Sequence, residues 1–395
     1  MQRSPATGDV VGGAILTILI LVIYVPITEL QINQRLVPND FKWHLNAVLP
    51  AMQGQIRSPH FLFQIVVALI YKMLPHQSVE SAAAIVIVGS QIITGAVLYF
   101  GFYRSVDKVT SGFIISLRIL LTILTMVVFD VAVLYFIDGH LYFGQVGLTS
   151  YHNPTIQLLK PIAAWLFLLV VKSMEEPKNA SACFYALLIS STVLSGLAKP
   201  TYIMCIVPAS AVMMFLGDRE RPIALWPMLI GLWLPTCCLL VWQYSFEYGG
   251  DDAVSVLWAP LLVFLHDSEL WTLIPKFVTG LTFPLVTLAM YPRVVLGDRA
   301  SVLAWIAMGV ASIYAYLVAE GPPRTFHGNL WWGMETCGFI LFAVTGRILL
   351  VKVFSIVSGR EALSYRIVLC LSSFLLHVAF GIVWYIDNYR LYRNW

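Results

Sequence analysis

The chain has 395 residues, of which 59% are hydrophobic and only 11% are charged. An average soluble domain carries about 25% charged residues, so this composition excludes a disordered chain, a coiled coil and nearly every soluble fold. The 24 basic and 21 acidic residues almost balance, and no run of Lys or Arg indicates nucleic-acid binding. The composition predicts an all-α, polytopic membrane protein, with a single transmembrane domain over residues 1–395 and membrane lipids around it.

Apolar stretches long enough to cross a bilayer recur along the whole chain. A transmembrane helix needs about 20 largely apolar residues. We expect eleven spans, at residues 10–30, 82–102, 112–137, 155–172, 182–197, 201–216, 223–245, 272–291, 301–319, 330–350 and 365–386. Lys199 and Pro200 separate the short spans at 182–197 and 201–216. These two segments therefore form either two thin spans or a broken helix pair that lines a cavity.

Residues 60–74 are apolar but number only 15, too few to span a bilayer comfortably. They either cross the membrane or lie along its surface as an interfacial helix. If they do not cross and the N-terminus is cytoplasmic, fourteen of the 24 Lys and Arg residues lie inside, mostly in short loops. This bias favours a large first outer loop, residues 31–81, that contains interfacial helices. It also places the C-terminus outside.

Histidines gather in the expected outer segments. The seven that do so are His44, His60, His76, His140, His152, His266 and His327, whereas His377 falls within a span. The greater length of the outer loops explains part of this distribution. Asp40 and His44 have helical spacing and share a face if Asp40 opens a helix. Asp40 then either caps an interfacial helix or takes part in chemistry.

Ionisable residues near or within the spans are the second signal, because such groups are costly unless they are paired or face a polar cavity. Lys199 either snorkels to the interface or faces a cavity, and the helix break at Pro200 favours the cavity. Lys160 makes a similar but weaker case. Asp130 either lines a cavity or belongs to a structural pair.

Known cofactor motifs are missing from sensible positions. We find no nucleotide-binding loop, no HExxH or GxSxG motif and no Cys/His spacing typical of a metal site. No cofactor is expected, and a divalent metal is not indicated.

The layout resembles the GT-C superfamily of integral-membrane glycosyltransferases over most of the chain. Members have a first span, a large outer loop with an acid near its start, juxtamembrane helices and about ten further spans; here the acid is Asp40. The segment SPHFLF at 58–63 looks like the start of such a juxtamembrane helix, with one proline before His60 and none after it. The phrases YHNPT (151–155), AKPTY (198–202) and EGPPRTFHGN (320–329) are similar to those of bacterial GT-C-like proteins. Asn39 stands where some subfamilies have a second acid, which puts a metal-dependent mechanism in doubt.

The resemblance implies an inverting glycosyltransferase at the outer face of a bacterial inner membrane. Its donor would be a polyprenyl-phosphate sugar, and its acceptor the hydroxyl of a glycan, lipid or protein. Such a donor needs cations to stabilise the departing phosphate, and a base to deprotonate the acceptor. Asp40 is the expected base. The expected substrate-binding residues are His44, His60, His152, Asn153, Lys199, Arg324, His327 and Asn329. Of these, Lys199, Arg324 and His327 are expected at the phosphate, converging with Asp40 on one outward-facing cavity.

Three other functions remain open. A transporter would place charges at the bilayer midplane and show paired half-repeats, and Asp130 is the one residue that fits. A non-catalytic GT-C-like subunit of a larger complex would leave Asp40 on a surface away from any cavity. A protein similar to an O-antigen ligase or polymerase would have its largest loop late in the chain, whereas here the first loop is the largest.

Overall fold

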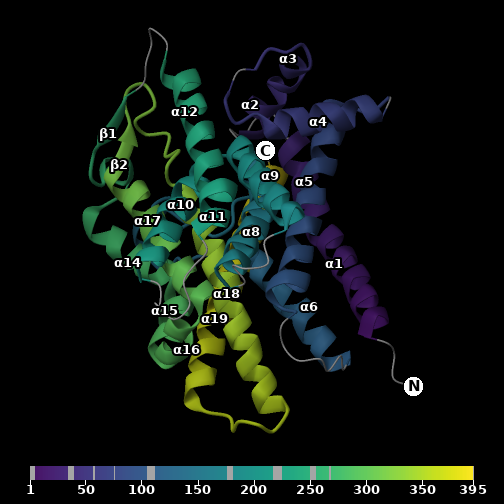
Figure 1. The fold of residues 1–395 in the computed structure, drawn as a ribbon, viewed down its shortest axis with the longest axis vertical. Coiled ribbons are helices and arrows are strands. Elements are labelled where there is room, and N and C mark those ends of the chain that lie inside the picture. Colours follow the sequence, from purple (N-terminus) through teal and green to yellow (C-terminus); the bar gives the residue numbers. More distant parts are fainter. Residues whose placement is uncertain are drawn as a thin grey trace.

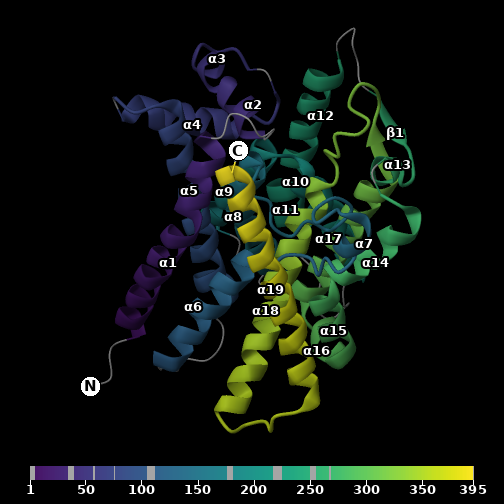
Figure 2. The same cartoon turned by 180° about the vertical axis from the view of Figure 1, so that it is seen from behind.

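The computed structural model describes residues 5–33, 40–56, 58–74, 76–104, 112–175, 181–216, 225–249, 255–266 and 268–394. These form an elongated helix bundle (Figure 1), seen from behind in Figure 2. The elements are α1 (Pro5–Asn33), α2 (Asp40–Asn46), α3 (Val48–Met52), α4 (Leu62–Met73), α5 (Val79–Ala96), η1 (Val97–Phe102), α6 (Gly112–Val127), α7 (Tyr135–Asp138), α8 (Pro154–Glu175), α9 (Ala182–Ala198), α10 (Thr201–Leu216), α11 (Leu225–Met228), η3 (Leu229–Trp233), α12 (Leu234–Tyr248), β1 (Val256–Trp258), α13 (Leu262–Leu265), α14 (Leu270–Gly280), α15 (Thr282–Met290), α16 (Pro292–Gly297), α17 (Arg299–Leu317), β2 (Val318–Glu320), α18 (Trp332–Val357) and α19 (Tyr365–Asn394).

Among the described residues, seven helical stretches are long and apolar enough to cross a membrane. They are Gly8–Asn33, Val79–Phe102, Pro154–Glu175, Leu225–Glu247, Arg299–Leu317, Trp332–Val357 and Tyr365–Leu391. The bent pair α14–α15 makes an eighth if it is one span, and α6, α9 and α10 are apolar but shorter. The chain is therefore an integral, multi-pass, helical membrane protein, and within its described part seven of the eleven expected spans, or eight with the bent pair, meet these criteria.

Two expected spans are not continuous helices. In the stretch 112–137, α6 ends at Val127 and α7 begins only at Tyr135. Gly381 of α19 packs against the Val127 carbonyl so closely that a Cβ would lie 1.7 Å from the oxygen. The stretch 272–291 bends by 59° between α14 and α15. Pro284 stands in the first turn of α15. Because proline has no N–H, Pro284 cannot donate to the Gly280 carbonyl four residues earlier, which weakens the helix at this point.

The first loop, 31–81, holds the three helices α2, α3 and α4 at one end of the bundle, here named the upper end (Figure 1). In both views α4 lies across this end and not along the bundle (Figures 1 and 2). Its 12 residues would reach about 18 Å at the 1.5 Å rise per residue of an α-helix. This is the geometry that an interfacial helix requires. Helix α1 begins at the lower end, and α19 ends at the upper end (Figure 2).

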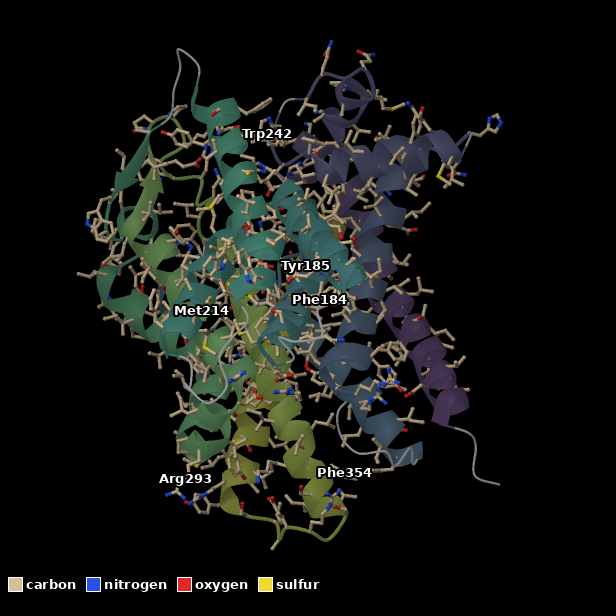
Figure 3. All side chains as sticks on the ribbon, viewed as in Figure 1. Phe184, Tyr185, Met214, Trp242, Arg293 and Phe354 are labelled. Carbon is tan, nitrogen blue, oxygen red and sulfur yellow. The ribbon has the colours of Figure 1, made fainter. Side chains whose placement is uncertain are left out.

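Helices α8 and α18 form the centre of the bundle and bury most of their side chains. Helix α18 packs against α17, α10, α8 and α6. Arg293, by contrast, lies at the lower end, and Trp242 of α12 lies near the upper end (Figure 3). Strands β1 and β2 form a small antiparallel sheet, pairing Val256 with Glu320, that was not expected from the sequence.

The segment after α7 was expected as an outer loop, but it folds into the bundle, and residues 144–151 are buried. Asp130 organises it: its carboxylate accepts the backbone N–H groups of Val146 and Gly147 at 2.9 Å and of Leu148 at 3.2 Å. Gly147 has φ +75°, which favours glycine. Asp130 therefore has a structural role, and its partners among the described residues are backbone amides.

Candidate functional site

A cavity of about 290 Å³ lies where the junction of α9 and α10 faces α12 and the segment that follows α17. Most of its surface is apolar, from residues such as Met204, Leu240 and Leu330. Its polar wall residues are His60, Lys199, Thr201, Gln243, Tyr244, Glu247, Tyr314, Glu320, Arg324 and Asn329. Four predicted site residues, far apart in sequence, therefore share this wall: His60, Lys199, Arg324 and Asn329. An apolar cavity with a few converging polar groups is typical of a ligand site.

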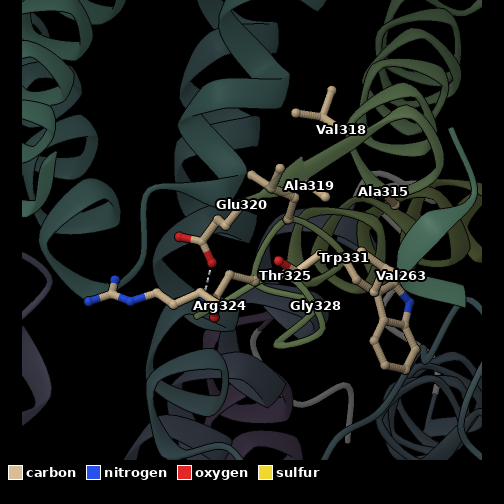
Figure 4. A pocket seen from close by; sticks show the side chains of 11 residues that line it. Val263, Ala315, Val318, Ala319, Glu320, Arg324, Thr325, Gly328 and Trp331 are labelled. Atoms are coloured by element: carbon tan, nitrogen blue, oxygen red, sulfur yellow. Dashed lines mark hydrogen bonds between the residues drawn. The ribbon is translucent and has the colours of Figure 1, made fainter. Parts of the chain in front are cut away.

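The segment from Glu320 to Leu330 forms one side of the cavity. Figure 4 shows Glu320 and Arg324 extending to the same side of this segment, away from the ring of Trp331. The guanidinium of Arg324 pairs with Glu247 of α12, so it ties the segment across the cavity. Asn329 donates from its amide to Glu320. The hollow beneath the segment offers about 10 Å³, no more than a single water molecule needs.

Lys199 lies at the break between α9 and α10 and is only 6% exposed. Its Nζ lies 4.9 Å from the centre of the Trp332 ring, a cation–π contact. Burial lowers the pKa of Lys199 to about 8, although Asp40, Glu335 and Glu320 act in the opposite direction. The side chain is thus mainly protonated at pH 7. It makes no hydrogen bond or ion pair with the described residues, which suits it to an anion in the cavity.

Asp40 begins α2, is half-buried and is held by Asn153, whose Nδ2 donates to Asp40 Oδ2 at 2.7 Å. The other end of Asn153 caps α8: Oδ1 accepts the backbone N–H of Thr155 at 3.1 Å and of Ile156 at 3.2 Å. Pro154 follows at the first helical position, where its missing N–H costs nothing. One asparagine therefore connects the helix start to the carboxylate. The positive end of the α8 dipole also favours a negative charge at this point.

Asp40 is beside the cavity and not in its wall. Burial lowers the pKa of Lys199 and of His152, and the nearby charge of Asp40 opposes this lowering in both. Within the part of the chain that the structure describes, only Asn153 donates to its carboxylate, and it does so at Oδ2. Oδ1 is thus left to accept a proton.

Two of the predicted histidines lie near these charged groups: His152 near Asp40 and Lys199, and His60 near Lys199. The ring of His152 packs on Tyr142 and Trp332 at 5.3 and 5.7 Å, and burial lowers its pKa despite the opposing effect of Asp40. His60 contacts Ser58 Oγ at 3.1 Å. Burial, followed by the nearby cation of Lys199, lowers the pKa of His60 to about 3. Both rings are therefore neutral hydrogen-bonding groups at neutral pH.

Two predicted residues have other surroundings. His44 is buried between α2 and α4, where Gln64 Nε2 donates to its Nδ1 at 2.9 Å and Phe63 packs against the ring. Burial holds the pKa of His44 well below the usual range, so the ring is neutral, and its hydrogen bond to Gln64 links α2 to α4. His327 is exposed and is not part of the cavity wall; its backbone N–H donates to the Arg324 carbonyl at 3.0 Å.

Sequence reasoning missed a buried carboxylate next to this site. Glu335 of α18 pairs with Lys160 Nζ at 2.9 Å and accepts the backbone N–H of Ser150 at 3.1 Å. Lys160 also donates to the Leu148 carbonyl at 3.1 Å. The available signal was the pair of Lys160 and Glu335, each within an expected span, because two opposite charges at membrane depth require one another. Thr201 and Gln243 of the cavity wall carried no comparable signal.

Among the described residues, no three His, Cys, Asp or Glu side chains are grouped so as to hold a metal ion. Comparison of the chain with models of protein families, with curated proteins and with solved structures found no match. The function is therefore argued from the geometry of this site.

Proposed function

We propose that this protein is a membrane glycosyltransferase of the GT-C type that uses a polyprenyl-phosphate sugar as donor. The topology proposed for it has eleven spans: the seven long apolar helices, the bent pair α14–α15, and the shorter α6, α9 and α10. The upper end, which carries α2–α4, is the outer face of a bacterial inner membrane. The N-terminus is then cytoplasmic and the C-terminus outside.

One observation carries the proposal: a buried ammonium, which forms no ion pair among the described residues, lines an apolar cavity, and a carboxylate lies beside that cavity. Asp40 and Lys199 are 159 positions apart in sequence, yet the charge of Asp40 acts directly on Lys199. Burying a cation without a counter-ion is costly, so such a residue usually faces a ligand or a functional cavity. An apolar cavity with one such cation suits a lipid that carries a phosphate.

In this mechanism the acceptor hydroxyl approaches Asp40, which takes its proton as the oxygen attacks the anomeric carbon of the sugar. The bond between that carbon and the phosphate oxygen breaks, and the electron pair leaves with the polyprenyl phosphate. Lys199 stabilises the phosphate, which is already a good leaving group and needs no general acid. Asn153 keeps Asp40 Oδ2 fixed so that Oδ1 faces the proton. A single displacement of this kind inverts the anomeric configuration.

The test is Asp40→Asn in the full-length protein, reconstituted in vesicles with a panel of labelled polyprenyl-phosphate sugars and a cell-envelope fraction as acceptor. The amide keeps the shape and the hydrogen bond from Asn153 but cannot take a proton. We expect donor turnover to fall by roughly 10²–10⁴-fold while donor binding persists. Asp387→Asn, the same change on an exposed part of α19, is the control and should keep full turnover. Full turnover in Asp40→Asn would refute the assignment of the base.

The second candidate is a non-catalytic GT-C-like membrane subunit. The position of Asp40 beside the cavity, and not in its wall, favours it. This candidate predicts donor binding without turnover in the unmodified protein for every sugar in the panel. The transporter alternative loses its main support, because Asp130 is occupied by three backbone N–H groups.

A further inference from the structure

The first turn of α10 forms part of the cavity wall. Lys199, Pro200, Thr201 and, one turn later, Met204 all line it. Helical hydrogen bonding begins with the Met204 N–H, which donates to the Pro200 carbonyl at 3.1 Å. The N–H groups before Met204 have no acceptor within the helix. The start of this 16-residue helix therefore presents donors and a partial positive charge at the cavity.

Two buried polar atoms at the same wall have no hydrogen-bond partner among the described residues: Thr201 Oγ1 and Gln243 Oε1. Their side chains are 6% and 5% exposed. Gln243 is held rigidly, because its Nε2 donates to the Gly196 carbonyl at 2.9 Å and to the Pro59 carbonyl at 3.1 Å. Other buried polar atoms of the described residues also lack a partner, but Thr201 Oγ1 and Gln243 Oε1 are the two that belong to the cavity wall, where a ligand can supply the missing hydrogen bond.

The donors and acceptors at this wall differ in the chemistry that they can recognise. The Lys199 ammonium, the Thr201 hydroxyl and the N–H groups of α10 can all donate to phosphate oxygens. Gln243 Oε1 can only accept, so it cannot bind an ionised phosphate oxygen but can accept from a sugar hydroxyl. The remaining apolar wall fits the hydrocarbon next to the phosphate.

We propose that the first turn of α10 is the phosphate subsite of this cavity, in which Lys199 and Thr201 bind a monophosphate ester and Gln243 accepts a hydroxyl of the group attached to it. This rests on the proposed function for the identity of the ester as a polyprenyl-phosphate sugar. Thr201 and Gln243 are then substrate-binding residues in addition to those expected from the sequence.

The charges of the wall favour one phosphate over two. Lys199 and Arg324 contribute two positive charges, and Glu247 and Glu320 contribute two negative charges, so the wall is formally neutral. The phosphodiester of a polyprenyl-phosphate sugar adds one negative charge, and a free phosphomonoester adds about 1.5–2; the helix dipole and Lys199 can stabilise this charge. A diphosphate would add at least one more charge in a largely apolar space, where an uncompensated charge is costly.

The test measures binding to the purified full-length protein in phosphatidylcholine nanodiscs. The probes are decaprenyl phosphate, decaprenyl diphosphate, decaprenol, inorganic phosphate and phosphatidylglycerol. We expect decaprenyl phosphate to bind at least tenfold more tightly than each of the other four. Equal binding of decaprenol, of the diphosphate or of phosphatidylglycerol would overturn a site selective for a polyprenyl monophosphate.

Variants separate the subsite from the fold. Thr201→Val removes the hydroxyl at constant shape and should weaken decaprenyl phosphate binding about tenfold, the value of one hydrogen bond to a charged group. Lys199→Met should weaken it further. The matched control is Thr236→Val. Thr236 is also a buried threonine whose hydroxyl has no hydrogen-bond partner among the described residues, but it lies outside the cavity wall, so ligand binding by this variant should be unchanged. Unchanged binding in Thr201→Val and Lys199→Met, with thermal stability retained, would overturn the subsite.

The outcome is independent of the proposed reaction. Selective binding of the monophosphate without turnover of any sugar donor would support the subsite and count against the glycosyltransferase. Turnover that depends on Asp40 but is unaffected by Thr201→Val would support the glycosyltransferase and count against the phosphate subsite. Gln243→Leu tests the sugar contact: it should weaken binding of a polyprenyl-phosphate sugar but not of decaprenyl phosphate, and an equal effect on both ligands would refute that contact.

Discussion

Asn153 has two separable roles, because one end of its side chain caps α8 and the other holds Asp40. Asn153→Asp keeps an acceptor for the cap and adds a negative charge at a helix start, which is favourable by about 0.3–1 kcal/mol. It also replaces the donor to Asp40 by a second carboxylate. Asn153→Ser keeps the capping ability, is too short to reach Asp40 and adds no charge.

The strength of the electrostatic repulsion in Asn153→Asp follows from the 2.7 Å contact between the side chains of residues 153 and 40, which would bring two carboxylates together. At a separation of about 4 Å, allowing for relaxation, and an effective dielectric constant of about 20, their repulsion is about 4 kcal/mol. That corresponds to about three pH units. We therefore expect the acidic limb of the pH–rate profile of Asn153→Asp to move upward by up to about three units. Turnover on the acidic side of the profile should then fall.

The assay is donor turnover from pH 5 to pH 9 in proteoliposomes, with thermal unfolding in detergent measured in parallel. Asn153→Ser should lose turnover without a displaced acidic limb, since no charge is added. Both variants should unfold within a few degrees of the unmodified protein. If Asn153→Asp showed the pH profile of the unmodified protein, Asn153 would be a helix cap only, and Asp40 would not act through this contact.

Three further outcomes follow from the geometry. Asp130→Ala leaves three buried N–H groups without an acceptor, which costs about 1–3 kcal/mol for each group. It should therefore lower the thermal unfolding temperature more than Asp130→Asn, which keeps one oxygen. Equal unfolding temperatures of the two variants would contradict the structural role of Asp130. Gly381→Ala should lower the thermal unfolding temperature, because the new Cβ would meet the Val127 carbonyl. The control is Gly309→Ala, which has open space around the new Cβ and should leave the unfolding temperature unchanged. Binding of decaprenyl phosphate should weaken about tenfold from pH 7 to pH 9, because Lys199, with a pKa of about 8, loses its charge as the pH rises. The Lys199→Arg variant should bind the ligand without this pH dependence. A binding affinity of the unmodified protein that does not change with pH would count against a contact between Lys199 and the phosphate.

The pH dependence assigned to Lys199 takes account of the groups around it. Asp40, Glu335 and Glu320 face it and favour its charged form, while burial opposes it. His44 and His60 are neutral across pH 7–9, because burial lowers the pKa of each. Lys199 is therefore the group expected to titrate near pH 8 at this wall.

Hydrophobicity along the chain was sufficient to predict a helical, multi-pass membrane protein, because a bilayer requires long apolar helices whatever their arrangement. The helices of the first loop were also expected, and α4 proved too short to cross and lies across the end of the bundle. Helix breaks were predictable only where the sequence contains a local cause. Pro200 marks the junction of α9 and α10. No proline or glycine stands near Val127, where α6 ends, and the contacts there come from α19: the Phe129 N–H donates to the His377 carbonyl at 3.1 Å, and Gly381 lies against the Val127 carbonyl.

The site shows the same division between local and long-range causes. Asp40, Lys199 and Asn153 could be selected from the sequence, since charged and polar residues stand out against an apolar chain. Their roles could not be separated there: Asp130 and His44 looked equally unusual, and only their partners, backbone N–H groups for Asp130 and Gln64 for His44, show that they are structural. Thr201 and Gln243 are common residue types at ordinary positions. They become candidates only because packing brings them to one cavity and leaves an oxygen of each without a partner, which is a property of the tertiary structure and not of the order of residues.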